Sequence, residues 1–187
     1  SGITTTGSTI ISDLESMPKG ILLWRAILQW LGGIGIIVMA ITLMPIMNVG
    51  GMQLFKTSNN DTAEKILPRS KQVTIRLITI YLFFTILCCL LYNIFGMSFF
   101  DSVTHSMTTL ATGGFSNYNN SIGHFNSASI EITSMIFVIL GSIPFIAYIK
   151  YLSGDKKIFF LDSQIVAFFK IIAFSVIFMF IYLSIVN

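Results

Sequence analysis

The sequence predicts an all-α integral membrane protein, and three observations lead to that fold class. Of the 187 residues, 54% are hydrophobic and only 10% are charged, and the mean hydropathy is +0.82, whereas soluble domains carry about 25% charged residues. Several apolar runs are longer than the ~18 residues typical of a membrane-spanning helix. The strict alternation of a membrane β-barrel is absent from the sequence, so the spanning segments are predicted to be helices.

Four segments are long and apolar enough to cross a bilayer as helices of about 20 residues. They cover residues 21–45, roughly 73–97, roughly 130–151, and about 165 to the end. Within the first, the stretch "LGGIGII" (31–37) indicates tight helix packing through small residues, with a binding loop as the alternative.

The connections between these spans differ in charge. Those between the first and second spans and between the third and fourth are basic, and they hold Lys56, Lys65, Arg69, Lys71, Lys150, Lys156 and Lys157. The connection between the second and third spans has neither Lys nor Arg. Because short basic loops stay in the cytoplasm, residues 46–72 and 152–163 are predicted to lie inside and residues 98–129 outside.

The outer connection contains a short amphipathic run, "SFFDSVTHSMTTL" (98–110), with Asp101 near its start, where a carboxylate suits a helix N-terminus. The polar stretch "ATGGFSNYNNSIGHFNSAS" follows. Non-helical backbone at membrane depth is tolerated only where protein buries it or where it lines a watery path. The pattern therefore predicts a re-entrant half-helix, too short to span, and a loop that returns to the outer surface.

The first residues repeat this plan. Aligning "TTTGS" (4–8) with "ATGGF" (111–115) places Thr5 on Thr112 and Gly7 on Gly114. The repeated unit consists of a helix, a half-helix, a glycine loop and a second helix. The second copy is complete, and the first lacks the part before its glycine loop. The fourth span would be the first helix of a third copy. Both ends of the chain look cut, so we interpret the sequence as a piece of a longer protein.

The two glycine loops favour an oxygen-lined site for a monovalent cation. Backbone carbonyls aimed at one axis can replace the hydration shell of such an ion, and glycine readily adopts the positive φ that this geometry often needs. The C-terminal dipole of a half-helix adds partial negative charge, and oxygen-rich loops without thiol or imidazole suit a hard ion better than a transition metal. One Gly-Gly pair alone is more typical of a turn, but its duplicate favours a selectivity filter.

Three stretches, in this order, carry a resemblance to a known family: "TTTGSTIISDLESMPKGILLWRAILQWLGGIGIIVMAITLMP", "GGMQLFK" and "GMSFFDSVTHSMTTLATGGFSNYNNSIGHF". They resemble the membrane, pore-forming subunit of bacterial Trk/Ktr-type potassium-uptake transporters. The resemblance implies repeated helix–P-loop–helix units, like those of K+ channels, around a central pore. It also implies that this chain is a fragment with the end of repeat 1, all of repeat 2 and the start of repeat 3.

The resemblance divides the chain into five parts. Residues 1–45 would hold the filter loop and second helix of repeat 1, and residues 73–151 would form repeat 2. Residues 46–72 and 152–163 would be cytoplasmic connections, and residues 164–187 would be the first helix of repeat 3. The family's third filter loop, its gating loop and its fourth repeat have no counterpart in this sequence.

The resemblance also implies site residues and partners. Gly7 and Gly114 would be the filter glycines for K+, the transported ion, and no cofactor would be tightly bound. Backbone or hydroxyl oxygens would come from their neighbours Thr4, Thr5, Thr6, Ala111, Thr112 and Gly113. The implied partners are the remaining repeats, a second copy in a homodimer, a cytoplasmic nucleotide-binding regulatory subunit and the lipid bilayer. The implied location is the bacterial inner membrane, which the chain would cross several times.

Other classes of function are less well supported by the residues. The net charge of +3 is too small to suggest a nucleic-acid partner. An intramembrane hydrolase would use Ser106, His105, His124 and Asp101, but there is no G-x-S-x-G motif, and adjacent His105 and Ser106 cannot readily pair on a helix. Both histidines are therefore interpreted as structural, and the protein is predicted not to be an enzyme. A non-transporting structural or assembly piece of a membrane complex stays open as the other alternative.

Overall fold

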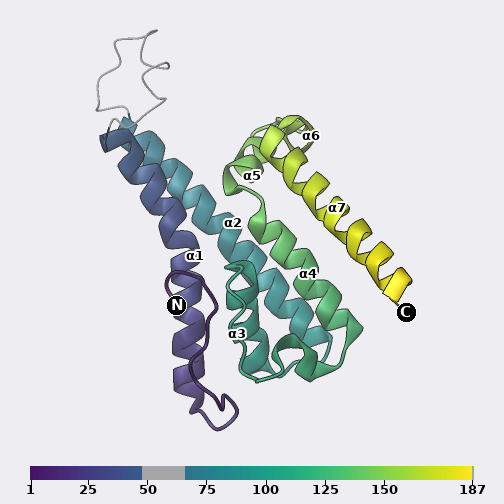
Figure 1. The fold of residues 1–187 in the computed structure, drawn as a ribbon. Coiled ribbons are helices and arrows are strands. Elements are labelled where there is room, and N and C mark those ends of the chain that lie inside the picture. Colours follow the sequence, from purple (N-terminus) through teal and green to yellow (C-terminus); the bar gives the residue numbers. More distant parts are fainter. Residues whose placement is uncertain (48–65, 187) are drawn as a thin grey trace. The chain divides into compact units, whose positions relative to one another are not determined.

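The computed structural model describes residues 1–47 and 66–186, and its regular elements there are all helices (Figure 1). Most of the predicted inner connection 46–72 lies outside the described residues. The chain divides into two compact units, Ser1–Ser142 and Ile143–Asn187. We describe each unit by itself.

The first unit is built on two long helices, α1 (Lys19–Met47) and α2 (Ile66–Ile94), of 29 residues each. Both exceed the ~20 residues that cross a bilayer, and they contain or overlap the first two predicted spans. Pro18 precedes α1 and its carbonyl oxygen accepts hydrogen bonds from the N–H groups of Ile21 and Leu22. Proline suits a helix start because its missing N–H would have no partner there.

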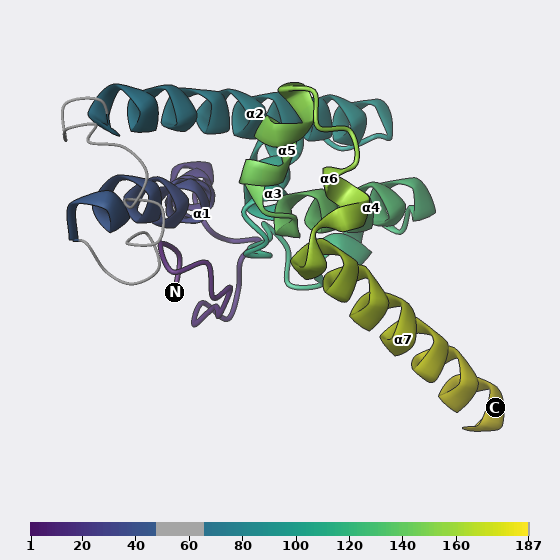
Figure 2. The same cartoon turned by 90° about the horizontal axis from the view of Figure 1, so that it is seen from above.

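Between the long helices and α4 (Ala128–Ser142) lies the short helix α3 (Phe99–Leu110), as both views show (Figures 1 and 2). Its 12 residues span only about 18 Å, which confirms the predicted half-helix. Ser98 caps it: the Asp101 N–H donates to Ser98 Oγ at 3.1 Å, and that hydroxyl donates to Asp101 Oδ2 at 2.7 Å. A short 3-10 helix, η3 (Ser121–Phe125), follows before α4.

The third predicted span, roughly residues 130–151, is not one continuous helix. It consists of α4, which ends at Ser142, and α5 (Phe145–Leu152). Pro144 separates them because its ring clashes with a preceding helical turn and it has no N–H to donate. The prediction of one unbroken helix was therefore wrong. It was based on the length of the apolar run and did not take Pro144 into account.

The second unit contains α5, the single turn α6 (Ile158–Leu161) and α7 (Ser163–Val186). Its core is formed by four buried aliphatic side chains, those of Ile143, Ala147, Ile158 and Ile165. The 24-residue α7 matches the fourth predicted span. Among the described residues, two helical stretches are long and apolar enough to cross a membrane, Gln72–Ile94 and Ser163–Ile185, or three if α4 and α5 count as one broken span.

Candidate functional site

The two glycine loops have the same unusual backbone conformation. Thr5 and Thr112 have φ of 51° and 54°, and Gly7 and Gly114 have φ of 75° and 74°. A β-branched residue rarely adopts positive φ, so the same departure at equivalent places is a strong structural signature. The sequence alignment of residues 4–8 with residues 111–115 is thus matched by the backbone.

The carbonyl groups of both loops are available to a ligand. The N–H groups of Gly113 and Gly114 turn back to the carbonyl oxygen of Thr108, at 3.0 and 3.4 Å. Within the part of the chain that the structure describes, the carbonyl oxygens of residues 4–7 and 111–114 accept no hydrogen bond. In the second loop, Thr112 and Gly114 are exposed, whereas Ala111 and Gly113 are buried. Oxygens of this kind can coordinate a cation that has lost its water.

The two loops touch each other and the helix α1. A Cβ placed on Gly7 would collide with the carbonyl oxygen of Gly113, so the loops meet at these two residues. On α1, a Cβ on Gly32 would collide with the backbone of Ile3, and one on Gly33 would lie 3.1 Å from the Ala111 Cβ. The "LGGIGII" stretch lies within α1, and two of its glycines, Gly32 and Gly33, pack closely against the loops, which agrees with the packing interpretation rather than with a binding loop.

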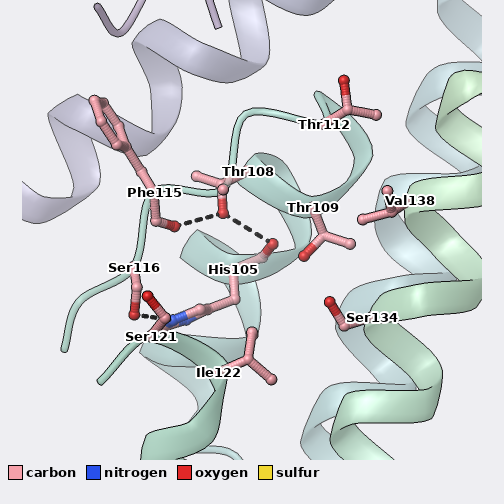
Figure 3. A pocket seen from close by; sticks show the side chains of 11 residues that line it. His105, Thr108, Thr109, Thr112, Phe115, Ser116, Ser121, Ile122, Ser134 and Val138 are labelled. Carbon is pink, nitrogen blue, oxygen red and sulfur yellow. Dashed lines mark hydrogen bonds between the residues drawn. The ribbon is translucent and has the colours of Figure 1, made fainter. Parts of the chain in front are cut away.

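The half-helix α3 also forms hydrogen bonds with the segment that follows the second loop, residues 115–117 (Figure 3). Thr108 Oγ1 donates to the carbonyl oxygen of Phe115 at 2.8 Å, and His105 Nε2 lies 3.0 Å from Ser116 Oγ. One turn earlier, Asn117 Nδ2 donates to Asp101 Oδ1 at 2.8 Å. The segment after the loop thus runs antiparallel to α3. These hydrogen bonds hold it against the helix that precedes the loop.

Asp101 closes this network at the N-terminal end of α3. Burial opposes the ionised carboxylate, but hydrogen bonds from Ser98, Asn117 and Tyr118 outweigh it and hold the pKa of Asp101 below its ordinary value. The carboxylate thus accepts three side-chain donors and also lies in the first turn of a helix, where negative charge is favourable.

The residues of the hydrolase alternative are held in structural roles. His105 Nδ1 lies 2.9 Å from the carbonyl oxygen of Asp101, which makes it the donor and leaves Nε2 to accept from Ser116. Ser106 Oγ donates to the carbonyl of Val103, and the ring of His124 stacks on Tyr118 at 3.6 Å between centroids. His105 therefore bonds Ser116 and the Asp101 backbone, and the predicted set does not assemble into a nucleophile and base. Across residues 1–47 and 66–186, no group of three or more His, Cys, Asp or Glu could hold a metal ion.

A cavity of about 100 Å³ lies beside the second loop (Figure 3). Thr112 and Gly114 border it from the loop, Thr109 from α3, and Ser134 and Val138 from α4. The cavity lining thus combines a few hydroxyl groups with a larger apolar surface.

Sequence reasoning missed Gln29, which lies on α1 and is fully buried (0% exposed). Its Oε1 accepts a hydrogen bond from the Phe115 N–H at 3.1 Å. An amide inside an apolar membrane helix is costly without a hydrogen-bond partner. A glutamine within the apolar run 21–45 could therefore have been recognised from the sequence as a residue with a specific partner.

The fold and the loops define a class of protein: an all-helical membrane protein in which the short helix α3 leads into a glycine loop that meets a second glycine loop. The comparisons with known proteins agree. The family model TrkH, described as a cation transport protein, matches residues 1–186, so the chain belongs to this family. The resemblance stated from the sequence is thereby confirmed.

Individual relatives give the same assignment. The Trk system potassium uptake protein TrkI of Halomonas elongata is 43% identical over 166 residues, 88% of this chain and 34% of that protein. TrkH of Escherichia coli is 39% identical over 167 residues, which cover 88% of this chain and 35% of TrkH. The crystal structure of the potassium transporter TrkH from Vibrio parahaemolyticus superposes with a TM-score of 0.75 at 35% identity, covering 90% of this chain and 34% of the other. The chain therefore spans about a third of the length of these relatives.

Proposed function

We propose that this chain is part of the pore-forming subunit of a Trk-type system that takes up K+ across the bacterial inner membrane. The observation that carries the proposal is the pair of touching loops with matched backbone dihedral angles and unengaged carbonyl oxygens. Backbone carbonyls held around an axis are the means by which a filter replaces the water of a K+ ion. The names of the relatives, which are potassium uptake proteins, supply the choice of ion.

In this proposal, eight residues contribute backbone or hydroxyl oxygens to the filter, namely Thr4, Thr5, Thr6, Gly7, Ala111, Thr112, Gly113 and Gly114. Two loops surround only part of an axis, so the remaining repeats of the same transporter supply the other oxygens. The half-helix α3 ends at the second loop and adds the negative end of its dipole to the site.

The proposal keeps the repeat boundaries as predicted. Residues 1–45 belong to repeat 1, residues 73–151 to repeat 2 and residues 164–187 to repeat 3. Residues 46–72 and 152–163 face the cytoplasm because of their lysines and arginines. A second copy of the subunit and a cytoplasmic nucleotide-binding regulatory subunit complete the proposed assembly.

The test uses Gly114→Ser in the complete transporter that carries this sequence. Gly114 has φ of 74°, where a side chain is strained, although no atom would crowd its Cβ within 4 Å. A strain of about 1–2 kcal/mol acts directly on the filter backbone, so we expect K+-selective uptake to fall roughly tenfold or more. The measurement is tracer uptake of rubidium and sodium in cells that lack their own K+ uptake.

The matched control is Gly123→Ser in η3, which is exposed, equally uncrowded and has no positive φ. We expect it to leave uptake and selectivity unchanged. Equal and mild effects of the two substitutions would reject the assignment of Gly114 to a filter.

A further inference from the structure

Gln29 occupies an unusual position for an amide. It lies in α1 with no exposed surface, and α1 is otherwise rich in apolar residues. Its Oε1 accepts from the Phe115 N–H at 3.1 Å, across 86 positions of sequence. Its Nε2 is buried and has no hydrogen-bond partner among the described residues. A buried donor without a partner is costly, so packing alone does not explain why this site holds an amide.

The amide of Gln29 lies against both glycine loops. A Cβ built on Gly113 would collide with the Gln29 amide carbon and would lie 2.6 Å from its Nε2. A Cβ built on Gly7 would lie 4.0 Å from the same Nε2. One side chain of α1 is thus in contact range of both loops at the place where they meet each other.

Arg25, one turn earlier on α1, contacts residues at the C-terminal ends of the same two loops. The Arg25 guanidinium lies 4.3 Å from the centre of the Phe115 ring, and its NH2 group donates to Thr9 Oγ1 at 2.9 Å. Residues four apart share a helix face, so Arg25 and Gln29 present one face of α1 to the loops. Phe115 is held by both, through its ring and its backbone N–H.

We propose that Gln29 is a positioning residue for ion selectivity: its Oε1 anchors the second loop at Phe115, and its amide sets the spacing between Gly7 and Gly113. This inference rests on the proposed function, because it assumes that the two loops form the filter. Cation selectivity depends on the number and placement of coordinating carbonyls. A side chain that fixes the separation of two loops therefore acts on selectivity without touching the ion.

The experiment compares three Gln29 variants in the complete transporter. Gln29→Met keeps the length but removes both polar groups, Gln29→Glu keeps an acceptor oxygen, and Gln29→Asn keeps the amide but withdraws it by one methylene. The readout is the ratio of rubidium to sodium tracer flux, which does not depend on how much protein reaches the membrane. Gln72→Met is the matched control, because Gln72 is exposed on α2.

We expect Gln29→Met to lower the flux ratio roughly tenfold, as the loss of a buried hydrogen bond would. Gln29→Glu should stay within about threefold of the unmodified transporter, Gln29→Asn should fall between the two, and Gln72→Met should have no effect. If Gln29→Met does not reach the membrane, the test rests on the other two variants. A lower ratio of rubidium to sodium flux for Gln29→Asn than for Gln29→Glu then supports the inference.

Unchanged flux ratios in all three Gln29 variants would overturn the inference, even if their protein levels fall. Gly114→Ser, measured in the same assay, separates this failure from a failure of the proposed function. If Gly114→Ser lowers the ratio and the Gln29 variants do not, only the role of Gln29 is rejected. If Gly114→Ser also leaves the ratio unchanged, the filter assignment itself is rejected.

Discussion

The two glycine loops share a backbone conformation but are stabilised by different neighbours. The first loop has local hydrogen bonds: the Thr5 N–H donates to the Gly2 carbonyl at 2.9 Å, and Thr4 Oγ1 lies 2.8 Å from Thr6 Oγ1. The second is attached to α3 through Thr108 and the residues that follow it. Since the same φ values arise in both settings, the conformation follows from what the loops share: a glycine at the second positive-φ position and close packing against α1. The half-helix then adds support.

The loops also differ in the space around their glycines. At Gly7 a side chain would meet both an unfavourable φ and the carbonyl of Gly113, whereas at Gly114 it would meet only the unfavourable φ. Gly113 does not have positive φ, yet Gln29 leaves no room for a Cβ there. Glycine is thus required for a different physical reason at each of the three positions.

The largest expected effect follows from this difference between Gly7 and Gly114. Gly114→Ala should destabilise the folded transporter by about 1–2 kcal/mol through backbone strain alone. Gly7→Ala adds a collision with backbone atoms and should cost about 3 kcal/mol or more. Thermal unfolding of the purified transporter in detergent measures both, with Gly123→Ala as the control. Equal shifts for the two variants would show that the first loop moves away from Gly113, and the comparison of their surroundings would fail.

A reciprocal exchange of the loop residues should give a smaller, asymmetric effect. Thr6 aligns with Gly113, so Gly113→Thr and Thr6→Gly each give one loop the residue of the other. The first should cost about 1–3 kcal/mol, because the new side chain must displace the buried Gln29 amide. The second should cost less than about 1 kcal/mol, because Thr6 is exposed. Thermal unfolding and tracer uptake check both variants, and a larger effect from Thr6→Gly would contradict the surroundings described for these loops.

Much of the fold could be predicted because it depends on local sequence. Apolar runs mark the long helices, the short run at 98–110 marks α3, and the Thr and Gly pattern aligns the loops. The break at Pro144 was also a local signal, but the length of the surrounding apolar run masked it. Contacts between distant segments could not be predicted in this way. The hydrogen bond of Gln29 with Phe115 depends on how the segments pack, and so does that of His105 with Ser116 rather than Ser106. The site was therefore predictable as two loops but not as the side chains that hold them.

The smallest expected effect tests whether the half-helix only supports the second loop. Thr108→Val keeps the shape of the side chain but removes the hydroxyl that donates to the Phe115 carbonyl at 2.8 Å. Losing this buried hydrogen bond should cost about 1 kcal/mol in thermal unfolding. Gly114 and the packing of the loop against α1 remain, so the ratio of rubidium to sodium flux should change less than in Gly114→Ala. Thr79→Val is the control, because Thr79 on α2 is exposed and its hydroxyl donates to the Ile75 carbonyl of its own helix. If Thr108→Val instead lowers the flux ratio as far as Gly114→Ala does, the conformation of the second loop depends on α3, and its likeness to the first loop does not come only from their glycines and their packing against α1.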